Sequence, residues 1–143
     1  EDAMNATKAA VSEGIICGGG SAYIHAQKKV GELLATLEGD EKTGARIVAK
    51  ALEAPLYTIV ENAGLEGPVI VDQVKKSEPG MGFDASSETF VDMMKQGIID
   101  PVKVTKNALT NAVSVAATLL TTEAAVADIK DNTPAPQPQP EMY

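Results

Sequence analysis

Three consecutive glycines, Gly18–Gly20, stand directly before an apolar segment and are a candidate for binding a phosphate. Glycines add no side-chain bulk, so backbone amides can approach a ligand closely, and the start of a helix attracts anions. A flexible or tight turn between two helices explains the same residues without a ligand. The Walker lysine with its Ser/Thr is absent and the Rossmann fingerprint is incomplete, so a complete small nucleotide-binding enzyme is not indicated.

Other reactive residue types have structural interpretations. His25 has no second His and no carboxylate at metal-ligand spacing, so no metal site is predicted. Cys17 follows two isoleucines and is interpreted as a small buried hydrophobe. Met93 and Met94, beside Phe90, are interpreted as core filler. We therefore assign none of these side chains to chemistry on spacing alone.

Three aspartates stand at positions that local structure favours. Asp2 and Asp100 lie where helices are predicted to begin, so N-capping explains each of them without a function. Asp84 opens the polar segment 84–87, where a turn favours Asp on local grounds. The spacing of these carboxylates therefore does not by itself indicate catalysis.

The composition limits the class of partner. The chain has 143 residues, a formal net charge of -8 and a single cysteine. An acidic protein repels phosphate backbones and anionic lipid, so nucleic acid and membrane surfaces are not expected as partners. Polar residues interrupt the most apolar segment, 108–127, so no membrane span is predicted. A single cysteine permits no internal disulfide, which agrees with a reducing, cytoplasmic compartment.

The elements that must position these residues are mainly helical. Apolar periodicity predicts a first helix over 2–13 with Gly14 as a left-handed cap. A second helix follows from Ser21, its predicted N-cap, and runs to Leu37. Residues 38–42 are predicted to form a turn.

The next apolar stripe, over 47–63, predicts a third helix with a kink at Pro55 and an end at Gly64. Gly67-Pro68 begins a short helix through Val74. Four helices are therefore predicted before Ser77.

The region between Ser77 and Gly97 breaks this pattern, because prolines and glycines end helices there and Phe83 and Phe90 flank a polar turn. We predict a small β-hairpin. A long helix after Asp100-Pro101 is expected to be the central buried helix. The fold class is mainly α, a helical layer with a small β element. The Pro/Gln-rich segment 131–143 predicts a disordered tail.

Motifs in one order along the chain carry a family resemblance. They are Glu1–Val11, Glu13–Gly20, Ala54–Leu56, Gly82–Ala85, Gly97–Val104 and Thr121–Glu123. In order and spacing they resemble the segment of group I chaperonins, the GroEL-like proteins, that re-enters the equatorial domain. The resemblance extends to about Lys130. Several motifs in one order are more specific than one glycine pattern, so the resemblance outweighs the turn interpretation of the triplet.

The resemblance implies a domain organisation. Residues 1–16 would be the end of the intermediate domain and its re-entry into the equatorial domain, and 17–130 would be the carboxy-terminal half of the equatorial ATPase domain, a helical bundle with a hairpin. The chain would then be a segment of a larger protein, and it would contain neither the amino-terminal equatorial half nor the apical domain.

The resemblance also implies roles for single residues. Gly18 and Gly19 resemble the glycines that approach bound ATP. Asp84, Ala85 and Ser86 resemble the turn beside the adenine. In addition, Ile98 would line the base, Asp100 resembles the acid near the ribose, and Asp2 resembles the catalytic aspartate that helps to orient the attacking water.

The cofactor implied is ATP, with Mg²⁺ and K⁺ in the parent subunit and their ligands outside this segment. The partners implied are the other subunits of a homo-oligomeric ring, a co-chaperonin and unfolded client proteins. The parent subunit would be an ATPase that drives protein folding, while the chain alone is expected to lack ATPase activity.

Two departures from the family pattern matter. Asp84 replaces the Asn often found at that turn, and the Pro/Gln tail replaces the Gly-Met repeats of bacterial members. The alternative interpretation of the whole chain is an acidic helical protein-interaction module without catalysis.

Overall fold

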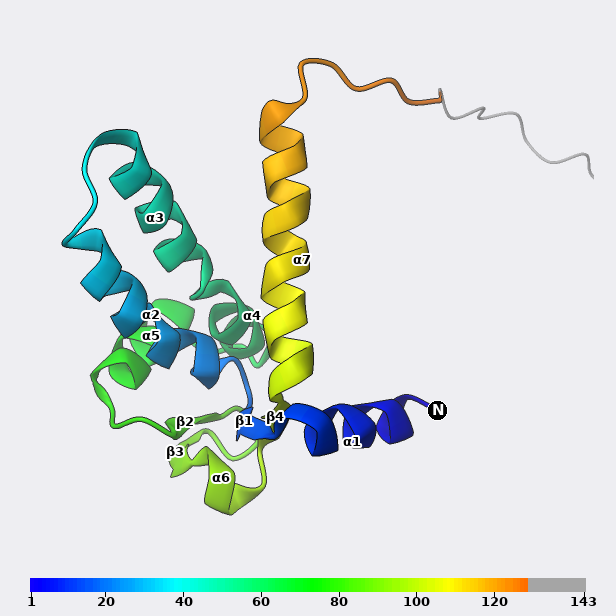
Figure 1. The fold of residues 1–143 in the computed structure, drawn as a ribbon. Coiled ribbons are helices and arrows are strands. Elements are labelled where there is room, and N and C mark those ends of the chain that lie inside the picture. Colours follow the sequence, from blue (N-terminus) through cyan, green and yellow to red (C-terminus); the bar gives the residue numbers. More distant parts are fainter. Residues whose placement is uncertain (129–143) are drawn as a thin grey trace, which may run out of the picture.

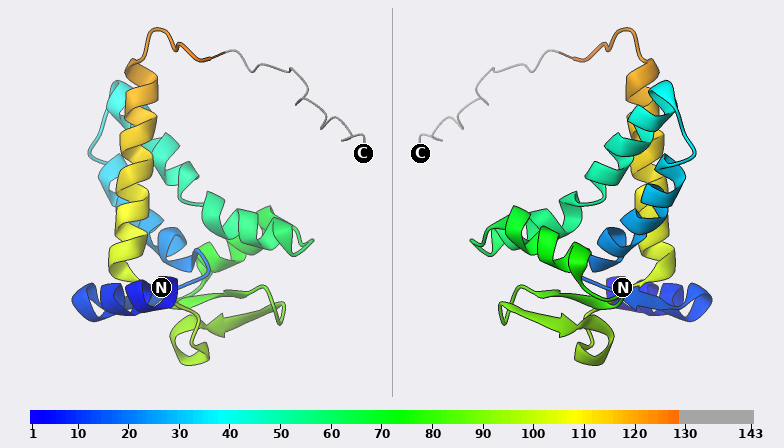
Figure 2. Two further views of the ribbon diagram at one scale, coloured as in Figure 1. Left: turned by 90° about the vertical axis from the view of Figure 1, so that its right-hand side faces the viewer. Right: turned by 90° about the vertical axis from the view of Figure 1, so that its left-hand side faces the viewer.

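The computed structural model describes residues 1–128, and helices dominate it (Figure 1). A layer formed by α2 to α5 stands above a small β-hairpin, while α1 runs along the base and α7 rises beside the layer (Figures 1 and 2). The elements are α1 (Asp2–Glu13), β1 (Ile15–Cys17), α2 (Ser21–Leu34), α3 (Gly39–Ala51), α4 (Ala54–Asn62), α5 (Gly67–Lys76), β2 (Met81–Asp84), β3 (Thr89–Asp92), α6 (Met93–Gln96), β4 (Ile99–Pro101) and α7 (Val102–Thr121). The mainly helical fold class with a small hairpin is confirmed.

The first helix has the predicted bounds, but its caps differ from the prediction. Glu1, not Asp2, is the N-cap, and Asp2 lies in the first turn, where a carboxylate interacts favourably with the helix dipole. Gly14 has φ 87° and ψ -172°, so φ is positive as expected but the residue is not in the left-handed helical conformation. The extended ψ directs the chain into β1 instead.

The second helix begins at Ser21 and ends at Leu34, three residues before the predicted Leu37. Ser21 was predicted to be its N-cap, which is wrong, because Gly20 occupies that position with φ 76°. A Cβ on Gly20 would stand 2.6 Å from the backbone nitrogen of Leu56. Both the left-handed conformation and the contact with α4 therefore require glycine at position 20.

The prediction of a single, kinked third helix is wrong. The segment forms two helices, α3 and α4, with Leu52 and Glu53 between them. Pro55 lies at the start of α4, where its missing amide costs no helical hydrogen bond, so it begins a helix rather than bending one. The turn predicted over 38–42 is also largely helical, because α3 begins at Gly39.

The predicted hairpin is confirmed. β2 and β3 pair antiparallel with Phe83 opposite Phe90, and their rings are 5.1 Å apart in a tilted arrangement. Short elements that were not predicted accompany it, namely the helix α6 and the β1–β4 pair. Asp100 lies in β4, and Pro101 is the N-cap of α7, so the predicted capping role of Asp100 is wrong.

Two clusters form the core of the described residues. The larger joins α2, α4, α5 and the hairpin, through Ile24, Leu56, Val60, Val71, Val74 and Phe83. The smaller consists of Cys17, Ala22 and Met93 and lies beneath the glycine triplet. Cys17 and Met93 are buried as predicted, whereas Met94 is 43% exposed and is not core filler.

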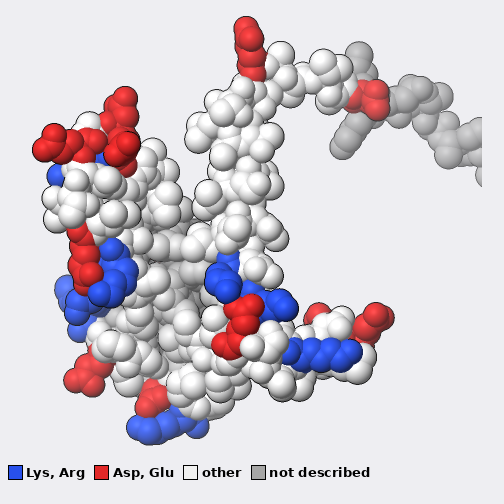
Figure 3. Space-filling view, viewed as in Figure 1, with Lys and Arg blue, Asp and Glu red and all other residues white. Residues whose placement is uncertain are grey.

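The long helix α7 is not the central buried helix that the sequence predicted. It has no buried residue, and its apolar side chains remain open, with Val115 70%, Leu119 72% and Leu120 85% exposed. Beyond Lys106 the helix carries no charge, and Figure 3 shows it white above its basic first turns. An uncharged helix with exposed apolar side chains is typical of a surface that another element or molecule covers.

Among residues 1–128 no helix combines the length and the apolar character needed to cross a membrane. The predicted disordered tail, 131–143, lies outside the described part of the chain.

Candidate functional site

A two-stranded antiparallel sheet brings two distant parts of the chain together at the candidate site. In the β1–β4 pair, Ile16 lies opposite Asp100 and Cys17 opposite Ile99. The ladder continues one step further, since the Gly18 amide donates to the Ile98 carbonyl at 2.9 Å. Gly18, Ile98 and Asp100, which the family resemblance assigns to one ligand, are therefore neighbours across this sheet.

Close packing explains why glycine occupies position 18. A Cβ on Gly18 would lie 3.1 Å from the Ile98 carbonyl oxygen. Gly19 has φ 61°, and a Cβ there would lie 3.0 Å from the Met93 methyl and 3.8 Å from the Phe83 carbonyl oxygen. The loop thus lies between β4 and β2, and both neighbours favour residues without side chains.

The same loop offers free hydrogen-bond donors. Within residues 1–128 the hydrogen bonds of the loop include one from Gly18 to Ile98 and one from Ser21 to Gly18, and none from the amides of Gly19 and Gly20. These two amides precede α2, whose start carries a partial positive charge. An oxygen ligand at this place would therefore find both donors and a favourable potential.

Asp100 supplies an acceptor beside this loop. Its carboxylate takes part in no hydrogen bond or ion pair in the described part of the chain, and partial burial raises the pKa of Asp100 above its ordinary value. Burial raises the pKa of the Cys17 thiol and the Tyr23 hydroxyl as well, and the nearby Asp100 charge adds to both shifts. A half-buried acceptor without a protein donor suits hydroxyl groups of a ligand.

The polar turn of the hairpin holds its own shape. Asp84 accepts hydrogen bonds from the Ser86 amide at 2.9 Å and from the Ser87 hydroxyl at 2.7 Å, and these bonds lower the pKa of Asp84. Ala85 packs against the larger core cluster. No hydrogen bond within residues 1–128 joins this turn to the glycine loop, and the link between them is Phe83, whose carbonyl faces Gly19.

Asp2 is the one assigned residue that stands apart. It begins α1, which leaves β1 and β4 and runs outward to the amino terminus (Figure 1). The helix from Asp2 to Glu13 has twelve residues and is about 18 Å long, and Asp2 stands at its far end from Gly14. In this arrangement Asp2 therefore does not lie beside Gly18 or Asp100.

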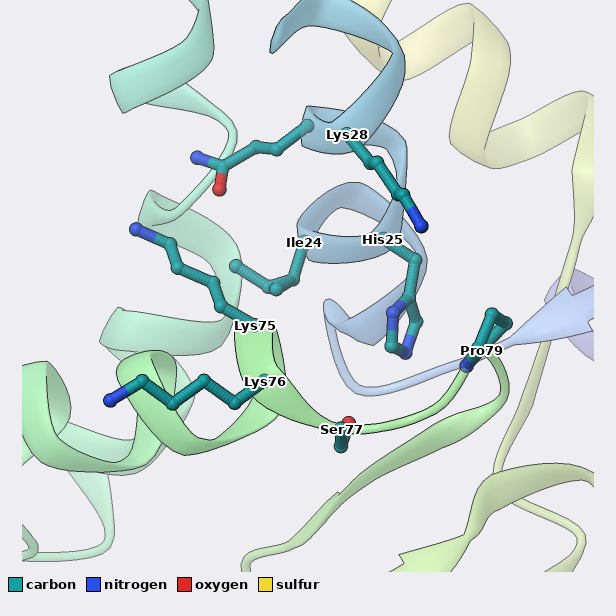
Figure 4. Close-up of a pocket in the computed structure, with 8 residues that line it drawn as sticks. Ile24, His25, Lys28, Lys75, Lys76, Ser77 and Pro79 are labelled. Atoms are coloured by element: carbon teal, nitrogen blue, oxygen red, sulfur yellow. The ribbon is translucent and has the colours of Figure 1, made fainter.

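Two hollows lie elsewhere on the surface. One, of about 550 Å³, lies between α2 and the end of α5 and is lined by His25, Lys28, Lys75 and Lys76 among others (Figure 4). The other, of about 780 Å³, lies between α3–α4 and α7, and its lining is mostly apolar. Neither contains an assigned site residue, and the described residues include no group of three or more His, Cys, Asp or Glu that could hold a metal ion.

Two residues that sequence analysis did not connect to the site contact its elements. Tyr23 donates from its hydroxyl to the Thr105 carbonyl at 2.8 Å and lies close to Asp100. Ser21 is fully buried under β2, and among residues 1–128 its hydroxyl has no hydrogen-bond partner. Their position directly after the glycine triplet, one turn or less into α2, was the only available signal.

Comparisons with known proteins agree with this fold. The structure is similar to the open-state monomer of a group II chaperonin from Methanococcoides burtonii, with a TM-score of 0.71 and 26% identity, covering 76% of this chain and 28% of that one. It is also similar to a group III chaperonin in the open state, with a TM-score of 0.76 and 30% identity, covering 82% of this chain and 25% of that one. The chain thus spans about a quarter of these proteins. The sequence model of the TCP-1/cpn60 chaperonin family matches residues 1–130, so the chain belongs to that family.

Proposed function

We propose that this chain is the carboxy-terminal equatorial segment of a group I chaperonin subunit and carries the nucleoside-binding half of its ATP site. The observation that supports this most directly is the pairing of β1 with β4, which joins the Gly18–Gly19 loop to Ile98 and Asp100. Free amides, an apolar side chain and an unpaired carboxylate then surround one small region.

Each of these groups suits a different part of a nucleoside. The carboxylate of Asp100 can accept hydrogen bonds from ribose hydroxyls. Ile98 is half-buried and offers an apolar surface to a base. The amides of Gly19 and Gly20 can donate to oxygen atoms, and the hairpin turn from Asp84 to Ser86 would approach the edge of the base.

Hydrolysis needs more than this half. ATP with Mg²⁺ supplies the phosphoryl group and the charge neutralisation for its transfer, and we propose that the ligands of Mg²⁺ and K⁺ lie outside this segment. Asp2 would orient the attacking water after α1 moves with the intermediate domain. Its distance from Asp100 in this arrangement agrees with a residue that acts only in a closed state.

The activity of the whole protein is also part of the proposal. We infer a homo-oligomeric ring in the cytoplasm that binds unfolded clients and a co-chaperonin and uses ATP to promote folding. The exposed apolar stripe of α7 supports a larger subunit, because such a surface requires a covering partner. Motif order from Glu13–Gly20 to Gly97–Val104 supports the group I assignment.

Nucleotide titration of the chain, labelled with ¹⁵N, tests the binding half. We expect ADP to shift the amide signals of Gly18, Gly19 and Ile98, and Asp100→Asn to remove most of the effect. Asp40→Asn, on the exposed start of α3, is the matched control. Unchanged signals at millimolar ADP would refute the nucleoside half-site.

An ATPase assay tests whether groups that are essential for hydrolysis lie outside this chain. The chain alone should hydrolyse ATP no faster than buffer, whereas a subunit that also contains the other equatorial half should be active. Turnover by the chain alone would contradict the proposal that essential groups lie elsewhere.

An acidic interaction module has less support. Figure 3 shows Lys/Arg and Asp/Glu side by side on the visible face rather than a single acidic surface. Several of these charges are paired with each other, as in Lys106 with Glu13 and Lys75 with Glu53. The exposed apolar side chains of α7, such as Val115 and Leu119, are a surface that a basic partner would not select.

A further inference from the structure

His25 connects the two halves of the candidate site without belonging to either. Its Nε2 lies 2.7 Å from the carbonyl oxygen of Met81, the first residue of β2. A carbonyl can only accept, so the ring donates this hydrogen bond. Figure 4 shows the ring directed from α2 toward the segment that leads from Ser77 and Pro79 into the hairpin.

This bond is the only one of its kind in the described part of the chain. No other hydrogen bond among residues 1–128 joins α2 to the β2–β3 hairpin. The other contacts between the two include packing of Ser21 against Gly82, and Ile24 and Phe83 share the larger core cluster. The hydrogen bond adds a directional constraint at Met81, the first residue of β2, because its strength depends on the donor–acceptor distance and angle.

The position of His25 on α2 makes this bond relevant to the glycine loop. It follows Ser21 by four residues, so both side chains lie on the same face of the helix, and that face meets β2. Gly19 and Gly20 precede this face directly. The helix therefore carries the glycine loop at its end and holds the hairpin one turn later.

We propose that His25 is a positioning residue for nucleotide binding, and that its hydrogen bond to Met81 sets the distance between the hairpin turn and the glycine loop. This inference rests on the proposed function, because it assumes that the turn approaches the base while the loop and Asp100 hold the sugar. His25 touches no part of the ligand. Its loss changes recognition of the base and leaves recognition of the sugar in place.

Two substitutions separate the hydrogen bond from the volume of the ring. His25→Phe keeps an aromatic ring of similar size but leaves the Met81 carbonyl without its donor. His25→Gln places an amide donor near the position of Nε2 and should restore the bond. Lys28→Ala is the matched control, because Lys28 lines the same hollow but makes no hydrogen bond to the hairpin in the described structure.

The experiment compares the affinities of ADP and ribose 5-phosphate for each variant by amide titration of the full 143-residue chain. We expect His25→Phe to weaken ADP about fivefold to tenfold, the effect of one net hydrogen bond, and to leave ribose 5-phosphate within about twofold. His25→Gln and Lys28→Ala should both keep the ratio of the original chain. A general loss of stability would weaken both ligands equally, so the ratio distinguishes positioning from unfolding.

Hydrogen exchange gives a second readout that needs no ligand. In His25→Phe, amides of the β2–β3 pair should exchange faster, and those of the β1–β4 pair should not change. An unchanged affinity ratio together with unchanged exchange would overturn the role of His25 and leave the proposed function intact. Absence of ADP binding by the original chain would overturn the proposed function, and the inference about His25 with it.

Discussion

The hydroxyl oxygen of Ser21 occupies the space where any side chain at position 82 would begin, because a Cβ built on Gly82 would stand 2.2 Å from it. The same Cβ would lie 2.7 Å from Cγ of Met93. The first residue of α2 and the middle of β2 are thus packed backbone against side chain, and this contact holds the hairpin over the start of the helix.

Gly82→Ala should therefore destabilise the chain by about 1–3 kcal/mol, the usual cost of overpacking a closed core. Chemical denaturation followed by circular dichroism would measure it. Gly44→Ala is the matched control, since a Cβ at this helical position meets nothing within 4 Å and alanine favours helix. The double variant with Ser21→Ala should lose less than the sum of the two single changes, and strict additivity would show that the two residues do not interact.

Asp100→Asn should make the folded chain more stable and its nucleotide binding weaker. Burial raises the pKa of Asp100, so the charged form opposes folding at pH values above the ordinary carboxyl range, and this penalty disappears as the pH falls through the raised pKa. The amide carries no charge, so the melting temperature at pH 7 should rise. ADP affinity should fall about tenfold or more, since hydrogen bonds to a carboxylate are lost. A lower melting temperature at pH 7 would show that Asp100 is stabilising instead.

Glu53 should make the folding stability of the chain depend on pH in the acidic range. Burial alone would raise its pKa, but hydrogen bonds from Lys50, Lys75 and Gln27 outweigh burial and lower the pKa to about 2. The stabilisation is therefore complete above the ordinary value of 4.5 and is lost as the pH falls toward 2. Glu53→Gln should cost about 1–2 kcal/mol at pH 7 and almost nothing near pH 2.

Denaturation at several pH values would measure this difference. Glu41→Gln, in the exposed first turn of α3, is the control and should show no such dependence. An equal effect of Glu53→Gln at both ends of the pH range would mean that the charge of Glu53 is not responsible.

The exposed apolar side chains of α7, Leu109 and Val113 among them, should make the chain self-associate when no other partner is present. Leu109 and Val113 line the hollow against α3 and α4 and are 37% and 47% exposed. We expect Leu109→Glu with Val113→Glu to give a monomer in light scattering after size exclusion. Val11→Glu, on α1, places a charge at an apolar residue that is 84% exposed and should leave association unchanged. A dilute, stable monomer of the original chain would contradict the prediction.

Local patterns in the sequence predicted those elements whose cause is local. The bounds of α1 follow from helical spacing, and the hairpin follows from Phe83 and Phe90 on either side of a polar turn. The break between α3 and α4 near Pro55 was misinterpreted as a kink, because a proline inside an apolar stripe fits either a bend in one helix or the first turn of a new helix. In the structure a new helix begins there, and its first residues pack against Gly20, a long-range contact that the apolar periodicity does not reveal.

The candidate site depends on pairing between β1 and β4, which are far apart in the sequence. The spacing of residues along the chain therefore could not predict which of them lie together. β1 and β4 have only three residues each, too few for a strand pattern, and Asp100 was therefore interpreted as a cap. The family resemblance, not the periodicity, selected Gly18, Ile98 and Asp100 together, and their adjacency in the structure agrees with that selection. The roles of these residues toward a nucleotide remain predictions.

Burial of α7 could not be judged from its sequence for a different reason. Its apolar stripe correctly indicates a surface that needs covering, but the pattern does not say which molecule covers it. Within residues 1–128 only its first turns are held, by Tyr23 at Thr105 and by Glu13 at Lys106.

The helix α7 is attached to the rest of the molecule through its first turns, and its uncharged remainder exposes apolar side chains to any partner. Its first turns are attached to α2 through Tyr23 and Thr105, and it follows the strand β4 without a break, so we expect a partner that docks along the helix to affect the position of β4. Assembly along α7 would then change the position of Asp100, which lies in β4 two residues before the helix begins.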